Sequence, residues 1–388
     1  MVATGLDILL RNTDSIRHRN IGLIVNQTSV TSDLKYSWDV LKEKGLHIQK
    51  IFSPEHGLFG TEQDQIAVGY QPESGCEMVS LYGDSAKTLI PDKAVLENLD
   101  LLLFDIQDVG ARYYTYLNTL ALCMEAISGR DIEIMVLDRP NPLGGTIVEG
   151  PLLDPAFNSF VGVFPVPVRH GMTAGELALF YRDFKKLDVN LSVISMHGWQ
   201  RSMLFHETGL PWIPPSPNMP AFATAEVYPG MCLFEGLNIS EGRGTTTPFQ
   251  LSGAPFIKPY DLAERCSSYR LEGVLFRPVW FKPTFHKFCG EVIGGIWLQV
   301  TDHARFRSFA TGVAMTAALH ELYPGQVQFL RGVYEFNGTI PAFDLLAGNS
   351  SIRTSILNNC NTSDILASWE HEEAEFSDRK SDFHLYEP

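Results

Sequence analysis

The chain has 388 residues, of which 45% are hydrophobic, 19% charged and 11% aromatic. These values are typical of a globular protein rather than a disordered one, and the length predicts two domains at about 100–200 residues each. The formal net charge of −15 repels phosphate backbones, so nucleic-acid binding through bulk charge is not expected.

Short apolar runs alternate with helical patterns through the first half of the chain. We predict strands at residues 21–25, 48–52, 78–82, 101–104, 132–137, 166–170 and 191–196. Helices are predicted at residues 36–44, 93–99, 115–128 and 177–184, the last of them opened by a capping box of Thr173 and Glu176. Such alternation with short connections is typical of a mostly parallel sheet, so we expect a Rossmann-like α/β fold.

The second half has a different pattern. The proline-rich residues 210–218 are too stiff for regular structure, and we expect the change of domain near them. Strands are predicted at residues 273–280 and 294–301, and helices at residues 259–269, 306–322, 343–358 and from 363 onward. We therefore predict a Rossmann-like N-terminal domain of residues 1–225 and a smaller α/β domain of residues 226–388. A solvent-facing helix face is expected for Glu370, Glu372, Glu373 and Glu375.

Polar side chains directly follow most of the predicted parallel strands. Ligands of open parallel sheets bind beyond the carboxyl ends of the strands, so these clusters predict a lined cleft. The clusters are Asn26, Glu55 with His56, Asp105 with Asp108, Asp138 with Arg139 and Asn141, and Arg169 with His170.

Glu55 is the sharpest candidate for an acid–base group. Pro54 restricts the residue before it to extended conformations, and Gly57 lets the chain turn away. A carboxyl at this position, beside the apolar Leu58 and Phe59, is expected to be partly desolvated. Desolvation raises a carboxyl pKa toward the range that a general acid needs. The alternative is a turn glutamate that caps a neighbouring helix.

The segment from Asp105 to Tyr114 offers further groups for carbohydrate chemistry. Asp105 or Asp108 could be the second carboxylate that most glycosidases need, and each could instead cap the helix that follows. Arg112 either binds a substrate carboxylate or pairs with Asp108. Tyr113 and Tyr114 offer aromatic faces on which a sugar ring can stack.

Four more side chains have two interpretations each. Arg139 either binds an anion or pairs with a neighbouring acid. His170 is either a general base or ligand-orienting donor, or a hydrogen-bonded structural residue. The loop SEGRGTTT at residues 240–247 has two glycines that allow close approach to a ligand. Its Glu241 and Arg243 either contact that ligand or pair with each other.

The sequence contains no motif typical of metal binding, of nucleotide binding or of catalysis through an acyl-enzyme. The six cysteines form no C-x-x-C pair, and no His/Cys/carboxylate cluster has the spacing of metal ligands. The first strand is not followed by G-x-G-x-x-G, the 240–247 loop lacks the Walker lysine, and no G-x-S-x-G occurs. We therefore expect neither a metal nor a cofactor.

Membrane and export signals are also absent from the sequence. No run reaches the roughly 18 apolar residues of a membrane-spanning helix, so no membrane span is predicted. The first twelve residues lack the basic and then apolar form of a signal peptide. We expect either a cytoplasmic protein or an exported one whose leader has been removed.

Several long motifs occur in the order found in one glycosidase family. They are SPEHG at residues 53–57, FDIQDVGARYY at 104–114, LDRPNP at 137–142, RHGMT at 169–173, EGRGT at 241–245, KPTF at 282–285 and WEHE at 369–372. Together they resemble the NamZ exo-β-N-acetylmuramidases, glycoside hydrolase family 171, over nearly the whole chain.

The resemblance implies an active site in the cleft between the two domains. The implied substrate is a terminal, non-reducing N-acetylmuramic acid (MurNAc) linked β-1,4 to N-acetylglucosamine (GlcNAc) in peptidoglycan fragments. The family's proposed catalytic glutamate matches Glu55. Our own hypothesis for the mechanism makes Asp105 or Asp108 the base or electrostatic support. Arg112 or Arg243 would then bind the lactyl carboxylate. A muropeptide- or glycan-binding protein without catalysis is the alternative.

Overall fold

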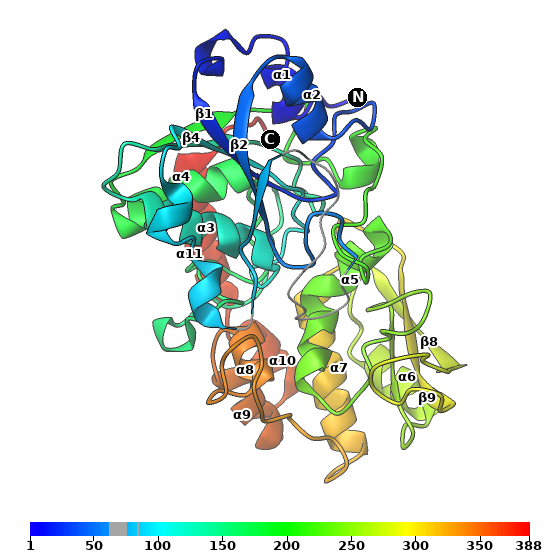
Figure 1. Cartoon of the computed structure of the whole chain (residues 1–388). Helices are drawn as coiled ribbons and strands as arrows, with labels where there is room; N and C mark the ends of the chain where they lie inside the picture. Colours follow the sequence, from blue (N-terminus) through cyan, green and yellow to red (C-terminus); the bar gives the residue numbers. More distant parts are fainter. Residues whose placement is uncertain (62–75, 84) are drawn as a thin grey trace.

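The computed structural model describes residues 1–61, 76–83 and 85–388. In this part of the chain the larger sheet has six strands, all parallel, in the order β3-β2-β1-β4-β5-β6. Figure 1 labels three of them, β1, β2 and β4. The six strands are β1 (Asn20–Val25), β2 (His47–Ser53), β3 (Glu77–Ser80), β4 (Leu101–Asp105), β5 (Glu133–Leu137) and β6 (Asn190–Ile194). This is the strand order of a Rossmann-type sheet, as the sequence predicts.

Helices cover both faces of this sheet because its strands are apolar on both sides. Leu101 and Leu103 of β4 pack into a cluster with α1 (Gly5–Leu9) and α2 (Ser37–Glu43). Leu102 and Phe104 point to the opposite face, since side chains alternate along a strand. There they pack with α3 (Thr115–Ile127) and α4 (Ala174–Lys185), and α4 begins with the predicted capping box.

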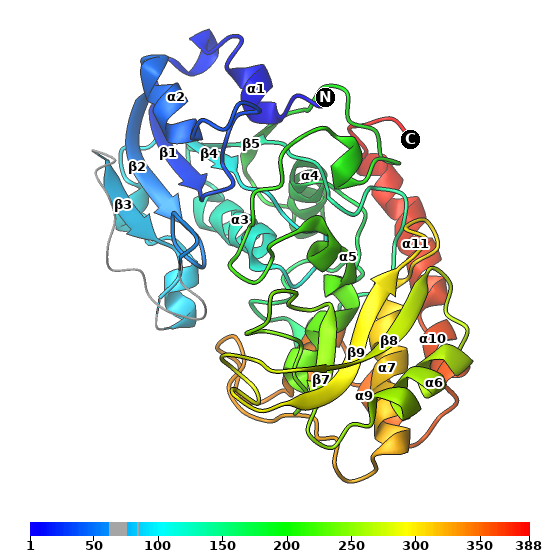
Figure 2. The same ribbon diagram turned by 90° about the vertical axis from the view of Figure 1, so that its right-hand side faces the viewer.

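The C-terminal part of the chain contains a small antiparallel sheet with helices beside it (Figure 2). Its described strands pair in the order β7-β9-β8, with bounds β7 (Leu251–Ala254), β8 (Val274–Phe281) and β9 (Ile293–Val300). The helices are α5 (Phe222–Met231), α6 (Pro259–Ser268), α7 (Ser308–Leu322), α8 (Ala342–Ala347), α9 (Ser351–Leu357), α10 (Thr362–Ala367) and α11 (Glu370–Lys380). One hydrophobic cluster runs from the larger sheet into these helices.

The chain returns to its N-terminal part at the end, so both termini lie on the same side of the molecule (Figures 1 and 2). The side chains of Glu372 and Glu373 in α11 accept hydrogen bonds from the backbone N–H groups of Leu152 and Gly150, each over 2.7 Å. The prediction that this acidic stretch is a solvent-facing surface is therefore wrong for these two residues. They hold α11 against the first domain.

Other sequence expectations differ locally from the structure. Residues 166–170 form no strand, because Arg169 makes only isolated bridges to Ala111 and Glu149. The helix expected at 93–99 is a short 3₁₀ turn (Lys93–Leu96). The helix expected at 343–358 is divided into α8 and α9 at Gly348, which has φ +82°. Helix α5 and strand β7 were not predicted.

None of the helices in the described ranges combines the length and the apolar character needed to cross a membrane.

Candidate active site

A pocket of about 370 Å³ lies where the N-terminal part (residues 1–225) meets the C-terminal part (residues 226–388). This is within the usual size of ligand pockets, about 300–1,000 Å³. The N-terminal part contributes Glu55, His56, Tyr113, Tyr114, Thr115, Tyr116, Val161, Ser216, Asn218 and Met219. The C-terminal part contributes Tyr228, Glu235, Arg243, Phe249, His286, Lys287, Leu330, Tyr334 and Glu335.

Glu55 is presented to the pocket by a tight turn after β2. The N–H of Gly57 donates to the carbonyl of Pro54 over 3.1 Å, and both His56 and Gly57 are left-handed, with φ +68° and +76°. A histidine in this conformation is strained, and such strain tends to occur at functional sites. The hydroxyl of Thr115, the first residue of α3, donates to Oε2 of Glu55 over 2.6 Å.

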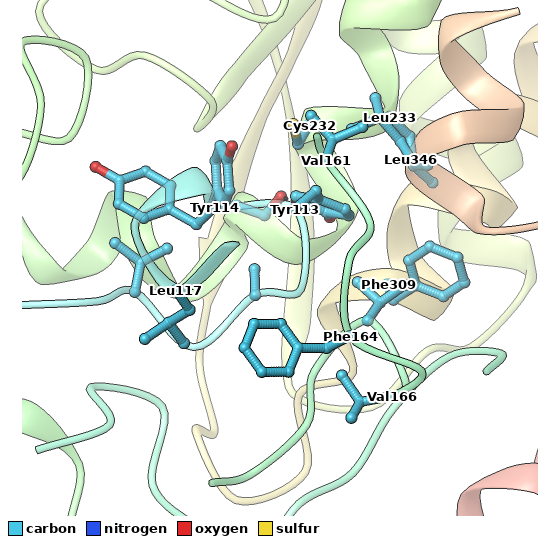
Figure 3. Close-up of a cluster of buried hydrophobic side chains, with 14 of the residues drawn as sticks. Tyr113, Tyr114, Leu117, Val161, Phe164, Val166, Cys232, Leu233, Phe309 and Leu346 are labelled. Atoms are coloured by element: carbon cyan, nitrogen blue, oxygen red, sulfur yellow. Dashed lines mark hydrogen bonds between the residues drawn. The ribbon is translucent and has the colours of Figure 1, made fainter. Parts of the chain in front are cut away.

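Tyrosines at the start of α3 form the wall next to Glu55. Tyr113 donates its hydroxyl hydrogen bond to the carbonyl of Pro229 in α5, which ties the two parts of the chain together at the pocket. The rings of Tyr113 and Tyr114 both meet Tyr228 edge to face, with centroids 5.6 and 5.7 Å apart. Figure 3 shows the two tyrosines in the hydrophobic cluster that contains Val161, Phe164, Cys232, Leu233 and Phe309.

The opposite wall is built on a buried carboxylate. Glu241 is fully buried, and its oxygens lie 2.9 Å from Nζ of Lys287, 3.2 Å from Nδ1 of His286 and 3.4 Å from Nε of Arg243. Burial by itself would raise the pKa of Glu241, but the three neighbouring groups outweigh burial and lower the pKa to about 2. Arg243 also pairs with Glu235 over 2.7 Å. We call these five residues the charged wall.

Two loops that are distant in sequence interlock to form this wall. The backbone N–H and the hydroxyl of Thr284 both donate to the carbonyl of Gly244 over 2.9 Å. Gly244 is left-handed at φ +78°, and a side chain there would lie 2.6 Å from the carbonyl oxygen of Phe285. Only glycine fits, because both the space and the backbone conformation exclude a β-carbon. The glycine loop at 240–247 and the KPTF segment are therefore one structural unit.

Five of the side chains that the sequence singled out line the pocket, namely Glu55, His56, Tyr113, Tyr114 and Arg243. Glu241 belongs to the charged wall but does not itself line the pocket, and it pairs with Arg243, which was one of its two interpretations. The other eight do not line the pocket and are nearly or completely buried: Asn26, Asp105, Asp108, Arg112, Asp138, Arg139, Asn141 and His170.

Asp105 and Arg139 form an ion pair beneath the strand ends. Arg139 Nε donates to Asp105 over 2.6 Å, and a second guanidinium nitrogen donates to the carbonyl of Val30 over 2.9 Å. Burial raises the pKa of Asp105, while Arg139 acts in the opposite direction. The Asn26 side chain accepts from the backbone N–H and hydroxyl of Thr28 over 2.9 and 2.6 Å. These contacts hold loops at the point where the strand order reverses.

Two other acids at the strand ends accept backbone hydrogen bonds. Asp108 accepts from the N–H of Gly110 over 2.6 Å, and burial raises its pKa to about 7. Asp138 accepts from the Thr173 hydroxyl over 2.6 Å and from the N–H of Gly175 over 2.9 Å. Burial raises the pKa of Asp138 to about 6. Both carboxyls order the loops behind the pocket.

Arg112, Asn141 and His170 also have internal partners. The guanidinium of Arg112 donates to the carbonyls of Pro151, Val166 and Leu346 over 2.8–2.9 Å. No ion pair with Asp108 forms among the described residues. Asn141 donates to the carbonyl of Met172 over 2.9 Å. His170 Nδ1 accepts from the N–H of Met172 over 3.2 Å, and burial lowers the His170 pKa to about 3, which keeps the ring neutral.

Several pocket residues were not predicted from the sequence. Glu235 lies in a 3₁₀ turn (Cys232–Gly236), and Glu335 lies in a loop where it is left-handed at φ +43°, as is Phe336 at +64°. Neither position has a periodic pattern that would have identified it. His286 and Lys287 directly follow the KPTF motif, so that motif was the available signal.

Within the described residues, no group of three or more His, Cys, Asp or Glu side chains could hold a metal ion. The side chains that line the pocket supply carboxyls, imidazoles, hydroxyls and cationic groups.

Two family models together match most of the chain. The model for the N-terminal region of the exo-beta-N-acetylmuramidase NamZ matches residues 21–223, and the model for its C-terminal region matches residues 226–386. The chain belongs to the NamZ family. Among curated NamZ proteins, it is 44% identical to the peptidoglycan beta-N-acetylmuramidase NamZ of Bacillus subtilis (strain 168), with 99% of this chain and 91% of that protein covered.

Solved structures share the fold of this chain. Two DUF1343 family proteins from Bacteroides fragilis NCTC 9343 have the same fold over 100% of this chain and 99% of theirs. The first superposes with a TM-score of 0.91 at 32% identity, and the second with a TM-score of 0.80 at 30% identity.

Proposed function

We propose that this chain is a glycoside hydrolase that removes terminal, non-reducing MurNAc from peptidoglycan fragments. The observation that carries the proposal is the position of Glu55, which lies in the NamZ motif SPEHG and lines the pocket between the two parts of the chain. An acid in a pocket of this size suits the release of one sugar from a chain end, because the sugar can enter the pocket while the rest of the glycan stays outside.

Glu55 is the proton donor in this proposal. Its carboxyl proton passes to the glycosidic oxygen as the bond from that oxygen to C1 of MurNAc breaks, and the GlcNAc side leaves as an alcohol. The Thr115 hydroxyl supports this role by holding Oε2 in a fixed orientation. Positioning of this kind aligns the proton with the leaving oxygen.

Glu235 or Glu335 is the second carboxylate in this proposal. Both line the pocket, whereas Asp105 and Asp108 lie outside it. Glu235 is held by Arg243 and by the hydroxyl of Tyr334 over 2.5 Å, and Glu335 accepts from the hydroxyl of Tyr82 over 3.0 Å. Such a carboxylate either acts on the reacting carbon or water, or orients the 2-acetamido group of MurNAc for substrate-assisted attack.

A chromogenic β-glycoside of MurNAc tests the proposal against a binding protein with the same cleft. The hydrolase is expected to release the chromophore from this compound with repeated turnover. Saturable binding of the glycoside with no released chromophore would overturn the proposal and favour the binding protein.

A further inference from the structure

The charged wall has an uneven balance of charge. Its two carboxylates, Glu235 and Glu241, alternate with three groups that can be cationic, Arg243, His286 and Lys287. With His286 protonated, the wall carries one positive charge more than it carries negative charges. An excess charge on the wall of a pocket attracts a ligand of opposite sign.

The excess charge faces the pocket at His286. The Lys287 ammonium is occupied by two backbone carbonyls, at 2.8 and 3.1 Å, and by Glu241 at 2.9 Å. Arg243 lies between Glu235 and Glu241. The side chains of Lys287 and Arg243 are 17% and 18% exposed, but that of His286 is 36% exposed. His286 is thus the most accessible cation of the wall.

The orientation of the His286 ring is set by its contact with Glu241. Nδ1 faces the Glu241 carboxylate at 3.2 Å, and among the described residues Nε2 has no hydrogen-bond partner. The two nitrogens lie on different sides of the ring, so Nε2 points away from Glu241. The backbone of His286 is left-handed at φ +66°, and the interlocked loops keep it there.

We propose that His286, oriented by Glu241, binds the lactyl carboxylate of the substrate and thereby selects MurNAc over GlcNAc. The two sugars differ only in this lactyl ether at O3, so one added anion is the feature to be recognised. The inference rests on the proposed function, because it assigns a subsite for the proposed substrate. Arg112 cannot take this role from its position outside the pocket, and Arg243 is already paired with two carboxylates.

The surroundings of His286 favour its cationic form. The hydrogen bond to Glu241 raises the His286 pKa above its ordinary value of 6.5, although partial burial acts in the opposite direction. The charged groups that line the pocket with it are Glu55, His56, Glu235, Arg243, Lys287 and Glu335. Burial acts to raise the pKa of Glu241, but Lys287, His286 and Arg243 lower it to about 2, so Glu241 is ionised near neutral pH.

The test compares two substrates that differ only in charge. One is the chromogenic β-glycoside of MurNAc, and the other is the same compound with the lactyl carboxylate converted to the neutral amide. His286→Asn removes the cation and suits the left-handed backbone, because asparagine tolerates that conformation. The ratio of kcat/KM for the acid to that for the amide should fall about ten- to a hundredfold, as expected for a hydrogen bond to a charged group.

The controls separate binding from folding. His47→Asn removes an exposed histidine at the start of β2, the opposite end of the strand from the turn that carries Glu55, and should leave the ratio unchanged. In the wild type, the ratio of kcat/KM for the acid to that for the amide should fall as the pH rises through the His286 pKa. In His286→Lys this ratio should stay high at all pH values where lysine remains charged. An unchanged ratio in a folded His286→Asn variant would overturn the inference.

Calorimetry of the binding of free MurNAc and of its amide tests the subsite without requiring hydrolysis. A loss of the acid's advantage in His286→Asn supports the carboxylate subsite even if no glycoside is hydrolysed, in which case only the proposed reaction has failed. Equal loss for acid and amide would contradict the subsite.

Discussion

The Thr115 hydroxyl donates to Oε2 of Glu55 over 2.6 Å, which links the first residue of α3 to the turn after β2. Thr115→Val removes this donor while it keeps the side-chain shape. Glu55 becomes a carboxylate as it gives up its proton, so the Thr115 donor is stronger in the transition state than before it. A hydrogen bond to a charged group contributes about 1.5–3 kcal/mol, so kcat should fall about ten- to a hundredfold. Steady-state kinetics on the MurNAc glycoside measure the loss.

Thr115→Ser should restore most of this activity, because it returns the hydroxyl. Thr354→Val, which removes an exposed threonine hydroxyl in α9, should leave kcat unchanged. If Thr115→Val and Thr354→Val had equal kcat, the Thr115 contact would have no part in catalysis.

The ion pair of Asp105 and Arg139 should affect stability far more than a surface pair does. Their side chains are 1% and 6% exposed. Asp105→Asn leaves Arg139 as a buried, uncompensated charge, which typically costs about 3–5 kcal/mol. Urea unfolding at pH 7 measures the change in the free energy of unfolding.

The matched control for this pair is Asp33→Asn. Asp33 and Lys35 lie 3.2 Å apart with both side chains 63% exposed, so their contribution should be about 0–1 kcal/mol. Equal unfolding free energies for the two variants would show that Asp105 is not part of the support that we describe.

Asp108 should make stability fall as the pH rises. Its pKa is about 7 in the folded protein because of burial, against an ordinary value of 3.8. The folded state therefore holds the proton to a higher pH than the unfolded chain does, and the free energy of unfolding decreases between about pH 4 and 7. Asp108→Asn keeps an acceptor for the N–H of Gly110 but does not titrate.

Urea unfolding of the wild type and of Asp108→Asn at two pH values checks this prediction. The variant should exceed the wild type by a few kcal/mol at pH 8 and be close to it at pH 4, since each pKa unit corresponds to about 1.4 kcal/mol. A difference that is the same at both pH values would mean that the Asp108 carboxyl does not titrate as described.

The central strands β1, β4 and β5 could be predicted from the sequence because they are buried on both faces and therefore appear as short apolar runs. The same signal failed at residues 166–170, where the apolar side chains are buried but the backbone makes only isolated bridges. Helix α5 was missed because Pro229 interrupts its pattern, and β7 because it has only 4 residues.

The sequence predicted only some of the pocket residues, because polar side chains at strand ends often bind the backbone of nearby loops instead of a ligand. Loops that follow parallel strands have many backbone groups that need partners, and buried polar side chains supply them. Asp138 and Asn141 do this, and so their polarity does not indicate contact with a ligand. Glu55 has the same polarity but projects into the pocket. Glu235 and Glu335 come from a 3₁₀ turn and a loop, which leave no periodic signal in the sequence.

Glu55→Gln tests the central claim most directly. Glutamine keeps an acceptor for Thr115 but has no proton to give, so release of MurNAc from a MurNAc–GlcNAc disaccharide should fall by about 10²–10⁴. Thermal unfolding should stay close to that of the wild type, and Glu97→Gln, at an exposed position, should hydrolyse the disaccharide normally. Turnover by folded Glu55→Gln at a rate near that of the wild type would contradict the account.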